Sequence, residues 1–260
     1  MAPAVDGAFA RWLADGAGDL LRTLRQDIGF DDPVALRHAG DKNSHDYIAT
    51  QLAKWRPGDA VLSEEAERDD PARLTAERVW IVDPLDGTRE FGEPGRNDWA
   101  VHIGLWVRSS TAPCQLAAAA IGLPAQERIL GTDFPPAYPP LSDQAASGGP
   151  LRLVVSRSRP PALVTDLAEA LGAELVPMGS AGAKIAAVIS GDVDAYVHAG
   201  GQYEWDSAAP VGVALATGMH ASRIDGSPLE YNRPDPLLPD LVVCRKDLAT
   251  RLLDAISRVA

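Results

Sequence analysis

The chain has 260 residues, enough for one large domain or for two halves that share one site. Hydrophobic residues make up 46% of it and charged residues 23%, as in ordinary globular proteins. The formal net charge of −12 argues against a nucleic-acid polymer as partner, because binding to phosphates needs clustered cations. An acidic chain that binds a small anionic substrate needs another source of positive charge, such as metal cations held by carboxylates.

The two cysteines, Cys114 and Cys244, are too few for a disulfide framework and favour a reducing compartment. The N-terminal segment lacks the basic start and apolar stretch of a signal peptide. No apolar run reaches the roughly 18 residues of a membrane span. We therefore expect a cytoplasmic protein without a membrane partner.

Apolar residues at helical spacing predict amphipathic helices over Ala8–Arg25 and Asp41–Trp55. The stretch AVLSEE predicts a short strand that ends at Glu64 and Glu65. The charged segment Ala66–Glu77 predicts a solvated loop or helical turn. Apolar runs predict further strands at Val79–Val82, Trp99–Val107, Ala117–Leu123 and Glu127–Thr132.

A segment rich in Pro, Gly and Ser, Asp133–Pro150, is the best linker candidate. We expect an N-terminal half over 1–134, a linker over 135–150 and a C-terminal half over 151–260, which together form one catalytic unit. In the C-terminal half, strands and helices alternate, which favours a layered α/β architecture. The predicted strands are Leu151–Ser156, Glu174–Pro177, Val193–His198, Met219–Arg223 and Leu241–Cys244. The predicted helices are Pro160–Leu171, Ala181–Ser190, Asp206–Thr217 and Asp247–Val259.

The stretch WIVDPLDGT (Trp80–Thr88) places two carboxylates, Asp83 and Asp86, directly after an apolar strand. Pro, Asp and Gly are common turn residues, so a plain strand and turn is one interpretation. A metal site that holds a phosphate is the other. Phosphatases of the haloacid dehalogenase type carry D-x-D-G-T, but the spacing here is one residue longer, which misplaces the aspartyl nucleophile.

Two further acidic positions accompany this motif, namely the pair Glu64-Glu65 and Asp206. Each has an ordinary structural explanation, because paired acids often lie on a solvated face and Asp favours helix N-caps. Two of the three acidic positions follow strands whose ends would lie side by side, and crowded carboxylates raise one another's pKa unless cations intervene. Oxygen ligands of this kind suit Mg²⁺ that shares a substrate phosphate.

The segments SEE, WIVDPLDGT and GSA…EWDSAAP, in this order, resemble the inositol monophosphatase superfamily. The resemblance extends from Asp41 to the last helix. It implies the layered α-β-α-β-α sandwich of the inositol monophosphatase and fructose-1,6-bisphosphatase type. It also implies hydrolysis of a phosphate monoester with two to three Mg²⁺ ions, inhibition by Li⁺, and in many members a homodimer.

The resemblance implies a role for each metal ligand. Asp83 would bridge two metals, Glu64 and the carbonyl of Leu85 would complete the first, and Asp86 and Asp206 would hold the second. A third, weaker metal would lie near Glu64.

The resemblance also assigns the residues around the phosphate. Gly87 and Thr88 would offer backbone N–H groups to it. Thr88, oriented by Asp41, would help Glu64 and the metals to position the attacking water. No catalytic Ser, Cys or His is then needed, and His38, His45 and His102 need only be surface or core residues.

Several residues favour a bisphosphate over inositol phosphates. Ala199 stands where inositol monophosphatases carry an acidic residue that contacts the sugar ring. VVSRSRPP (Val154–Pro161) and GSAGAKIAAVISGD resemble segments of the branch that hydrolyses 3′-phosphoadenosine 5′-phosphate. Gly179, Ser180 and Asp206 would contact substrate there, and the cations that would bind its second phosphate are Arg157, Arg159 and Lys184.

Those cations have an alternative explanation as surface charges near helix starts. Arg159 replaces the branch's histidine, and RHAGD (Arg37–Asp41) lacks the threonine that the family carries two residues before its aspartate. The aromatic residues Tyr203, Trp205 and Tyr231 either frame a base or pack in the core.

The leading hypothesis is therefore a Mg²⁺-dependent phosphatase of 3′-phosphoadenosine 5′-phosphate, and also of its sulfated form, in sulfate assimilation. The alternative within the superfamily is a phosphatase of inositol monophosphate or fructose 1,6-bisphosphate. A hypothesis of another class is a metal-dependent binding protein without catalysis. The presence of the whole set of acidic residues and Thr88 argues against that hypothesis.

Overall fold

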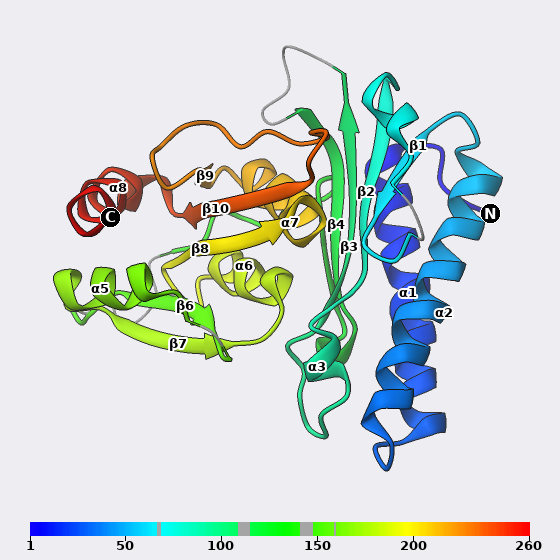
Figure 1. The fold of residues 1–260 in the computed structure, drawn as a ribbon, viewed down its shortest axis with the longest axis horizontal. Coiled ribbons are helices and arrows are strands. Elements are labelled where there is room, and N and C mark those ends of the chain that lie inside the picture. Colours follow the sequence, from blue (N-terminus) through cyan, green and yellow to red (C-terminus); the bar gives the residue numbers. More distant parts are fainter. Residues whose placement is uncertain (67–68, 109–114, 141–147, 159) are drawn as a thin grey trace.

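The computed structural model describes residues 1–66, 69–108, 115–140, 148–158 and 160–260. Within these residues the chain forms two five-stranded sheets separated and flanked by helices (Figure 1). Helices α1 and α2 cover the outer face of the first sheet, α6 and α7 lie between the sheets, and α5 and α8 cover the outer face of the second. The predicted layered α-β-α-β-α sandwich is confirmed.

The first sheet has the order β1-β2-β3-β4-β5, in which only β1 and β2 pair in parallel. Its strands are β1 (Ala60–Ser63), β2 (Arg78–Asp86), β3 (Ala100–Val107), β4 (Leu116–Leu123) and β5 (Arg128–Gly131). The helical segments of this half are α1 (Asp6–Ile28), α2 (Pro33–Trp55), η1 (Pro71–Leu74), α3 (Thr88–Phe91) and η3 (Pro124–Gln126).

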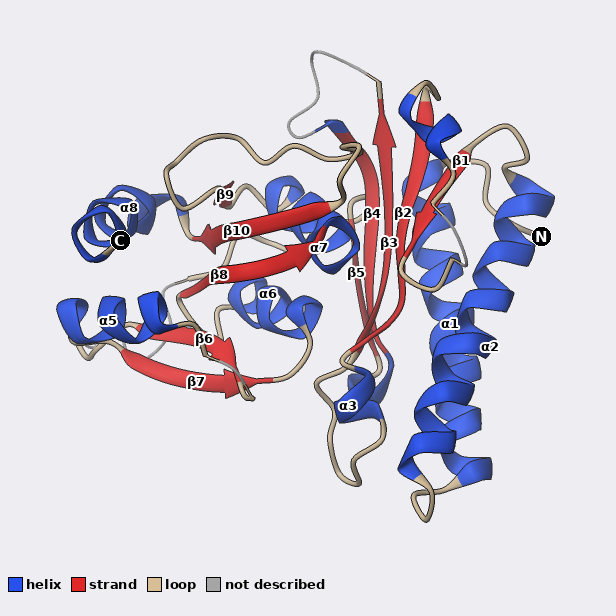
Figure 2. Ribbon diagram, viewed as in Figure 1, coloured by secondary structure: helices blue, strands red, loops and turns tan. Residues whose placement is uncertain are grey.

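The second sheet has the order β7-β6-β8-β10-β9, parallel across β7-β6-β8 and antiparallel beyond (Figure 2). Its strands are β6 (Arg152–Ser156), β7 (Glu174–Met178), β8 (Ala195–Tyr203), β9 (His220–Ser222) and β10 (Leu237–Cys244). The helices of this half are α5 (Ala162–Leu171), α6 (Ala181–Ser190), α7 (Glu204–Ala216) and α8 (Lys246–Val259).

The two-residue alternation of side chains along β2 explains why helices cover both faces of the first sheet. Val79 and Ile81 join the cluster around α6 and α7, whereas Trp80 and Val82 join the cluster under α1 and α2. The cluster between the sheets also contains Val188 of α6, so both halves of the chain contribute to one core. The end of β2 is thereby held between these layers.

Two predicted boundaries near the carboxylates differ from the structure. Helix α2 begins at Pro33 rather than Asp41, because Asp32 accepts hydrogen bonds from Val34 N and Ala35 N and proline suits the first helical position. Asp41 therefore lies inside the helix. Strand β2, which was predicted to end at Val82, runs on to Asp86, and its pairing with β3 shifts register between Asp83 and Asp86, which marks a bulge.

The prediction of a solvated segment over 66–77 is wrong for Arg73, which is fully buried. Its guanidinium makes a set of hydrogen bonds that allows a buried cation, as described below. Within the predicted linker, residues 141–147 lie outside the described residues, whereas the Tyr138 hydroxyl accepts a hydrogen bond from Lys246 N. Cys114 also lies outside the described residues. Among the helices described, none combines the length and the apolar character needed to cross a membrane.

Candidate active site and metal centre

The parallel strands β1 and β2 deliver two carboxylates to the same edge of the first sheet. Glu64 follows β1, and its backbone N–H donates to Val82 O at 3.3 Å. Asp83 is 1% exposed, and its Oδ1 accepts from Leu85 N at 3.0 Å. Its buried Oδ2 has no hydrogen-bond partner within the described part of the chain, which is a costly arrangement unless a cation or proton occupies that side.

The second half of the chain supplies the opposite wall. Asp86 Oδ2 accepts from Gly182 N at 2.8 Å and from the Ser180 hydroxyl at 2.5 Å, at the start of α6. Asp206, in the first turn of α7, accepts from Tyr203 N at 2.6 Å. The Asp86 contacts join the two halves of the chain, and the repulsion between Asp206 and Asp86 places Asp206 in the same region.

Burial and mutual repulsion raise the pKa values of three carboxyl groups in this region. Glu64 is exposed as a residue, but partial burial of its carboxyl group, followed by repulsion from Asp206, raises its pKa to about 7. Burial, followed by repulsion from Asp86, raises the pKa of Asp206 to about 7. Burial and the neighbouring carboxylates raise the pKa of Asp83 well above its usual value.

The donor set fits divalent cations. It consists of hard carboxylate oxygens, one of which is Asp83 Oδ2, the atom without a hydrogen-bond partner among the described residues. A bound cation would reduce the repulsion between these carboxylates. Ligand atoms of Asp83, Asp86 and His102 also lie within 4.8 Å of one another. The predicted metal ligand Leu85 is 2% exposed and directly follows Pro84.

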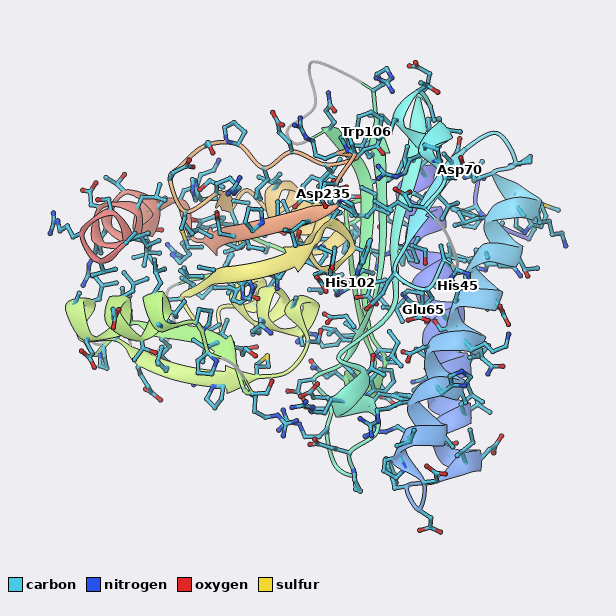
Figure 3. All side chains as sticks on the ribbon, in the orientation of Figure 1. His45, Glu65, Asp70, His102, Trp106 and Asp235 are labelled. Atoms are coloured by element: carbon cyan, nitrogen blue, oxygen red, sulfur yellow. The ribbon has the colours of Figure 1, made fainter. Side chains whose placement is uncertain are left out.

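His102 is the residue near these carboxylates that the sequence interpretation missed. It is fully buried on β3, opposite Asp83 in the β2–β3 pairing. In Figure 3 it lies between the first sheet and the central helices. Its Nδ1 lies 3.0 Å from Trp205 O, so this nitrogen carries the proton, and its Nε2 faces Asp86 Oδ2 at 3.3 Å. The antiparallel pairing of the two predicted strands could have indicated this residue, because the register of β2 and β3 sets His102 opposite Asp83.

Gly87 and Thr88 lie where the bulge of β2 turns into α3. Gly87 has φ 84°, and a Cβ there would come within 3.1 Å of Ser180 Cβ, so glycine permits both the backbone turn and the close packing. Thr88 Oγ1 lies 3.2 Å from Asp41 Oδ1 and 3.0 Å from Leu85 O. Burial, followed by repulsion from Glu65, raises the pKa of Asp41 to about 6.

The cations predicted for a second phosphate have other partners in the structure. Arg157 Nε and Nη2 donate to Glu90 Oε1 at 3.1 and 2.8 Å, and Nη2 also donates to Glu93 Oε1 at 2.9 Å. The Lys184 ammonium is buried and donates to the carbonyl oxygens of Gly179 and Ser180. Burial lowers the pKa of Lys184. Arg159 lies outside the described residues.

The three aromatic residues divide into two groups. Tyr203 and Trp205 stack with ring centroids 4.7 Å apart, and Tyr203 is exposed. Tyr231 is 4% exposed and its hydroxyl lies 3.2 Å from Ser207 Oγ, so it packs in the core. Two other predicted positions have defined places in the fold. The Gly179 N–H donates to Asp98 Oδ2, and Ala199 lies on strand β8, where it pairs with Asp240 of β10.

Comparison with known proteins places this geometry in a family. The model of the inositol monophosphatase family matches residues 11–259, and the chain belongs to this family. The resemblance found in the sequence is thereby confirmed.

The individual relatives are more specific. The chain is 55% identical over 244 residues to the 3′-phosphoadenosine 5′-phosphate phosphatase of Mycobacterium bovis, covering 93% of this chain and 89% of that protein. It is 52% identical over 262 residues to the protein of the same name from Mycobacterium leprae, covering 98% and 94%. Among solved structures, CysQ from Bacteroides thetaiotaomicron matches with a TM-score of 0.74 at 26% identity, covering 91% of this chain and 96% of that one.

Proposed function

We propose that this chain hydrolyses the 3′-phosphate of 3′-phosphoadenosine 5′-phosphate to give AMP and inorganic phosphate. The observation that carries the proposal is the convergence of Glu64, Asp83, Asp86 and Asp206 beside the Thr88–Asp41 pair. Relatives named for this substrate, at 55% and 52% identity over nearly the whole chain, support the choice of ester.

Glu64, Asp83, Asp86, Asp206 and the carbonyl of Leu85 would hold Mg²⁺, two or three ions in all, and Li⁺ would inhibit. When bound, such cations neutralise the phosphate and lower the pKa of water, which makes hydroxide available near neutral pH. The negative charge of the crowded carboxylates attracts cations. The bound cations would then allow the anionic phosphate to approach this acidic site.

The chain's own part in the reaction is to orient water. The Thr88 hydroxyl has one proton, and when it donates that proton to Asp41 its lone pairs accept a hydrogen bond from water. The water oxygen then points at phosphorus. A new P–O bond forms to this oxygen while the bond between phosphorus and O3′ breaks. One proton of the attacking water ends on O3′ as its hydroxyl hydrogen, and the other stays with the released phosphate. Asp41, with a pKa of about 6, is mostly ionised at pH 7 and accepts the threonine hydrogen bond.

Arg157 supports a substrate with a second phosphate. Glu90 is 6% exposed, and it holds Nε and Nη2 of Arg157 with the charge-assisted geometry of a guanidinium–carboxylate pair. Among the described residues, Nη1 makes no hydrogen bond. We infer that this fixed guanidinium offers Nη1 to the phosphate that the metals do not reach. The sulfated form of the substrate, and a place in sulfate assimilation, extend the same proposal.

The test compares kcat/KM for 3′-phosphoadenosine 5′-phosphate, inositol 1-phosphate and fructose 1,6-bisphosphate. We expect the adenosine bisphosphate to be preferred by at least about tenfold, or about 1.4 kcal/mol of transition-state free energy. A tenfold preference for either other ester would make the substrate proposal wrong. No Mg²⁺-stimulated phosphate release from any of them would favour the binding-protein hypothesis.

A second comparison isolates the role of Arg157. Adenosine 3′-monophosphate differs from the proposed substrate only by the missing 5′-phosphate. The variant Arg157→Met should lower kcat/KM for the bisphosphate by about tenfold to a hundredfold and leave the monophosphate nearly unchanged. An equal loss on both esters would show that Arg157 does not bind the second phosphate. Arg233→Met, at an exposed arginine paired with Glu230, is the control.

A further inference from the structure

A buried hydrogen-bond network connects the two segments that carry Glu64 and Asp206. Arg73 lies nine residues after Glu64 in the sequence, on η1, which packs against β1. Asp206 lies in the first turn of α7. Within the described residues no hydrogen bond joins the Glu64 and Asp206 side chains, and their like charges repel. Something else must hold these two segments at a fixed separation.

The first half of the network is centred on Arg73, which is fully buried. Its Nη1 donates to Asn232 Oδ1 at 2.8 Å, and its Nη2 donates to Arg233 O at 2.9 Å. Its Nε and Nη2 also donate to the two carboxylate oxygens of Asp69, at 2.6 and 2.7 Å. In return, Asn232 Nδ2 donates to Arg73 O at 3.1 Å. A buried arginine with this many fixed partners defines the position of its segment closely.

The second half of the network joins the same Asn232-Arg233 backbone to the start of α7. Glu204, 1% exposed, accepts from Asn232 N at 2.6 Å and from Arg233 N at 2.7 Å. Asn232 has φ 60°, a left-handed conformation that costs free energy in a non-glycine residue and persists because the surrounding contacts determine it. Figure 3 labels Asp70 and Asp235, one on each of the two segments that the hydrogen bonds of Arg73 join.

We propose that Arg73, Asn232 and Glu204 are positioning residues that act as one clasp and set the separation of Glu64 and Asp206. The inference rests on the metal site of the proposed function and not on the identity of the substrate. Asp206 lies two residues after Glu204 on the same helical turn, so a shift of Glu204 moves Asp206 as well. Loosening the clasp lets the two carboxylates move apart and weakens their joint hold on cations.

The test measures Mn²⁺ binding to the folded protein by electron paramagnetic resonance, without substrate. The principal variant is Asn232→Gly, because glycine adopts the left-handed backbone and keeps both N–H donors to Glu204 while removing the two side-chain hydrogen bonds between Asn232 and Arg73. We expect Kd for Mn²⁺ to rise by about tenfold to a hundredfold, the usual effect of losing support around metal ligands. Arg73→Met should have a similar effect, and Arg233→Ala, which keeps its backbone contacts, should stay within about twofold.

The kinetic signature separates positioning from general destabilisation. At saturating Mg²⁺, Asn232→Gly should regain most of its kcat, whereas the Mg²⁺ concentration for half-maximal activity should rise with Kd. A lower melting temperature with unchanged Kd would show that the clasp is only structural and would overturn the inference. Parent protein that binds no Mn²⁺ would overturn the metal site itself, and the clasp proposal with it. If Arg73→Met fails to fold, Asn232→Gly decides the question.

Discussion

The substitution Asp206→Asn should make the metal-free protein more stable at pH 8. Asn keeps an acceptor for the Tyr203 N–H and removes one carboxylate from the crowded site. Burial and repulsion raise the pKa of Asp206 from 3.8 to about 7. A rise of about three pKa units corresponds to about 4 kcal/mol at 1.36 kcal/mol per unit, which is the upper limit of the gain.

The sign depends on pH. Because the folded-state pKa is raised, the stability associated with Asp206 is fully present below its unfolded pKa and is lost as pH rises from about 4 through about 7. The parent and the variant should therefore be nearly equal at pH 4 and should separate by pH 8. The gain of up to about 4 kcal/mol corresponds to a rise in Tm of roughly 2–4 °C per kcal/mol for a chain of this size.

The assay is calorimetric or urea unfolding in EDTA at both pH values. Asp235→Asn is the matched control, because Asp235 is exposed and also accepts a backbone N–H, from Leu237. Saturating Mg²⁺ should raise the stability of the parent far more than that of Asp206→Asn, since a ligand that binds only the folded state stabilises it by mass action. A variant no more stable than the parent at pH 8, or a gain that persists at pH 4, would refute the picture of mutually repelling carboxylates.

Three further substitutions test separate parts of the site. Thr88→Val should lower kcat by about a hundredfold and leave the Mg²⁺-induced rise in Tm unchanged. A kcat close to that of the parent protein would argue against water orientation by the Thr88 hydroxyl. Lys184→Met should cost about 1–3 kcal/mol in urea unfolding, because the Gly179 carbonyl loses its ammonium donor and the Ser180 carbonyl keeps only a backbone N–H. A change only in bisphosphate KM, with stability intact, would instead support the substrate contact predicted for this lysine. Gly182→Ala should cost about 1–3 kcal/mol, because a Cβ would lie 2.0 Å from His102 Nε2, whereas Gly58→Ala, with open space around it, should be neutral. Equal stabilities for these two alanine variants would contradict the packing around His102.

The positions of the proposed metal ligands could be predicted because they depend on local sequence. Asp83 and Asp86 follow a strand whose apolar run is evident, and the parallel pairing of β1 and β2 places Glu64 beside them. Asp206 lies in the first turn of a helix with a distinctive motif. In each case a few consecutive residues determine where the carboxylate lies.

The partners of buried charges were not predictable in the same way. The burial of Arg73 depends on Asn232, which is 159 residues away in the sequence, and the orientation of Arg157 depends on Glu90, 67 residues away. No local pattern distinguishes such an arginine from a solvated one. The charged composition of 66–77 therefore favoured a solvated loop or helical turn; a helical turn is present at Pro71–Leu74, but its Arg73 is fully buried.

The most direct test of the central claim is the identity of the product formed from 3′-phosphoadenosine 5′-phosphate. Purified protein with Mg²⁺ should release one phosphate and yield AMP with its phosphate on the 5′ oxygen, identified by chromatography against adenosine 3′-monophosphate. The same protein in EDTA should yield neither product. Adenosine 3′-monophosphate as the product, or AMP formation unaffected by EDTA, would contradict the metal-dependent 3′-phosphatase proposed here.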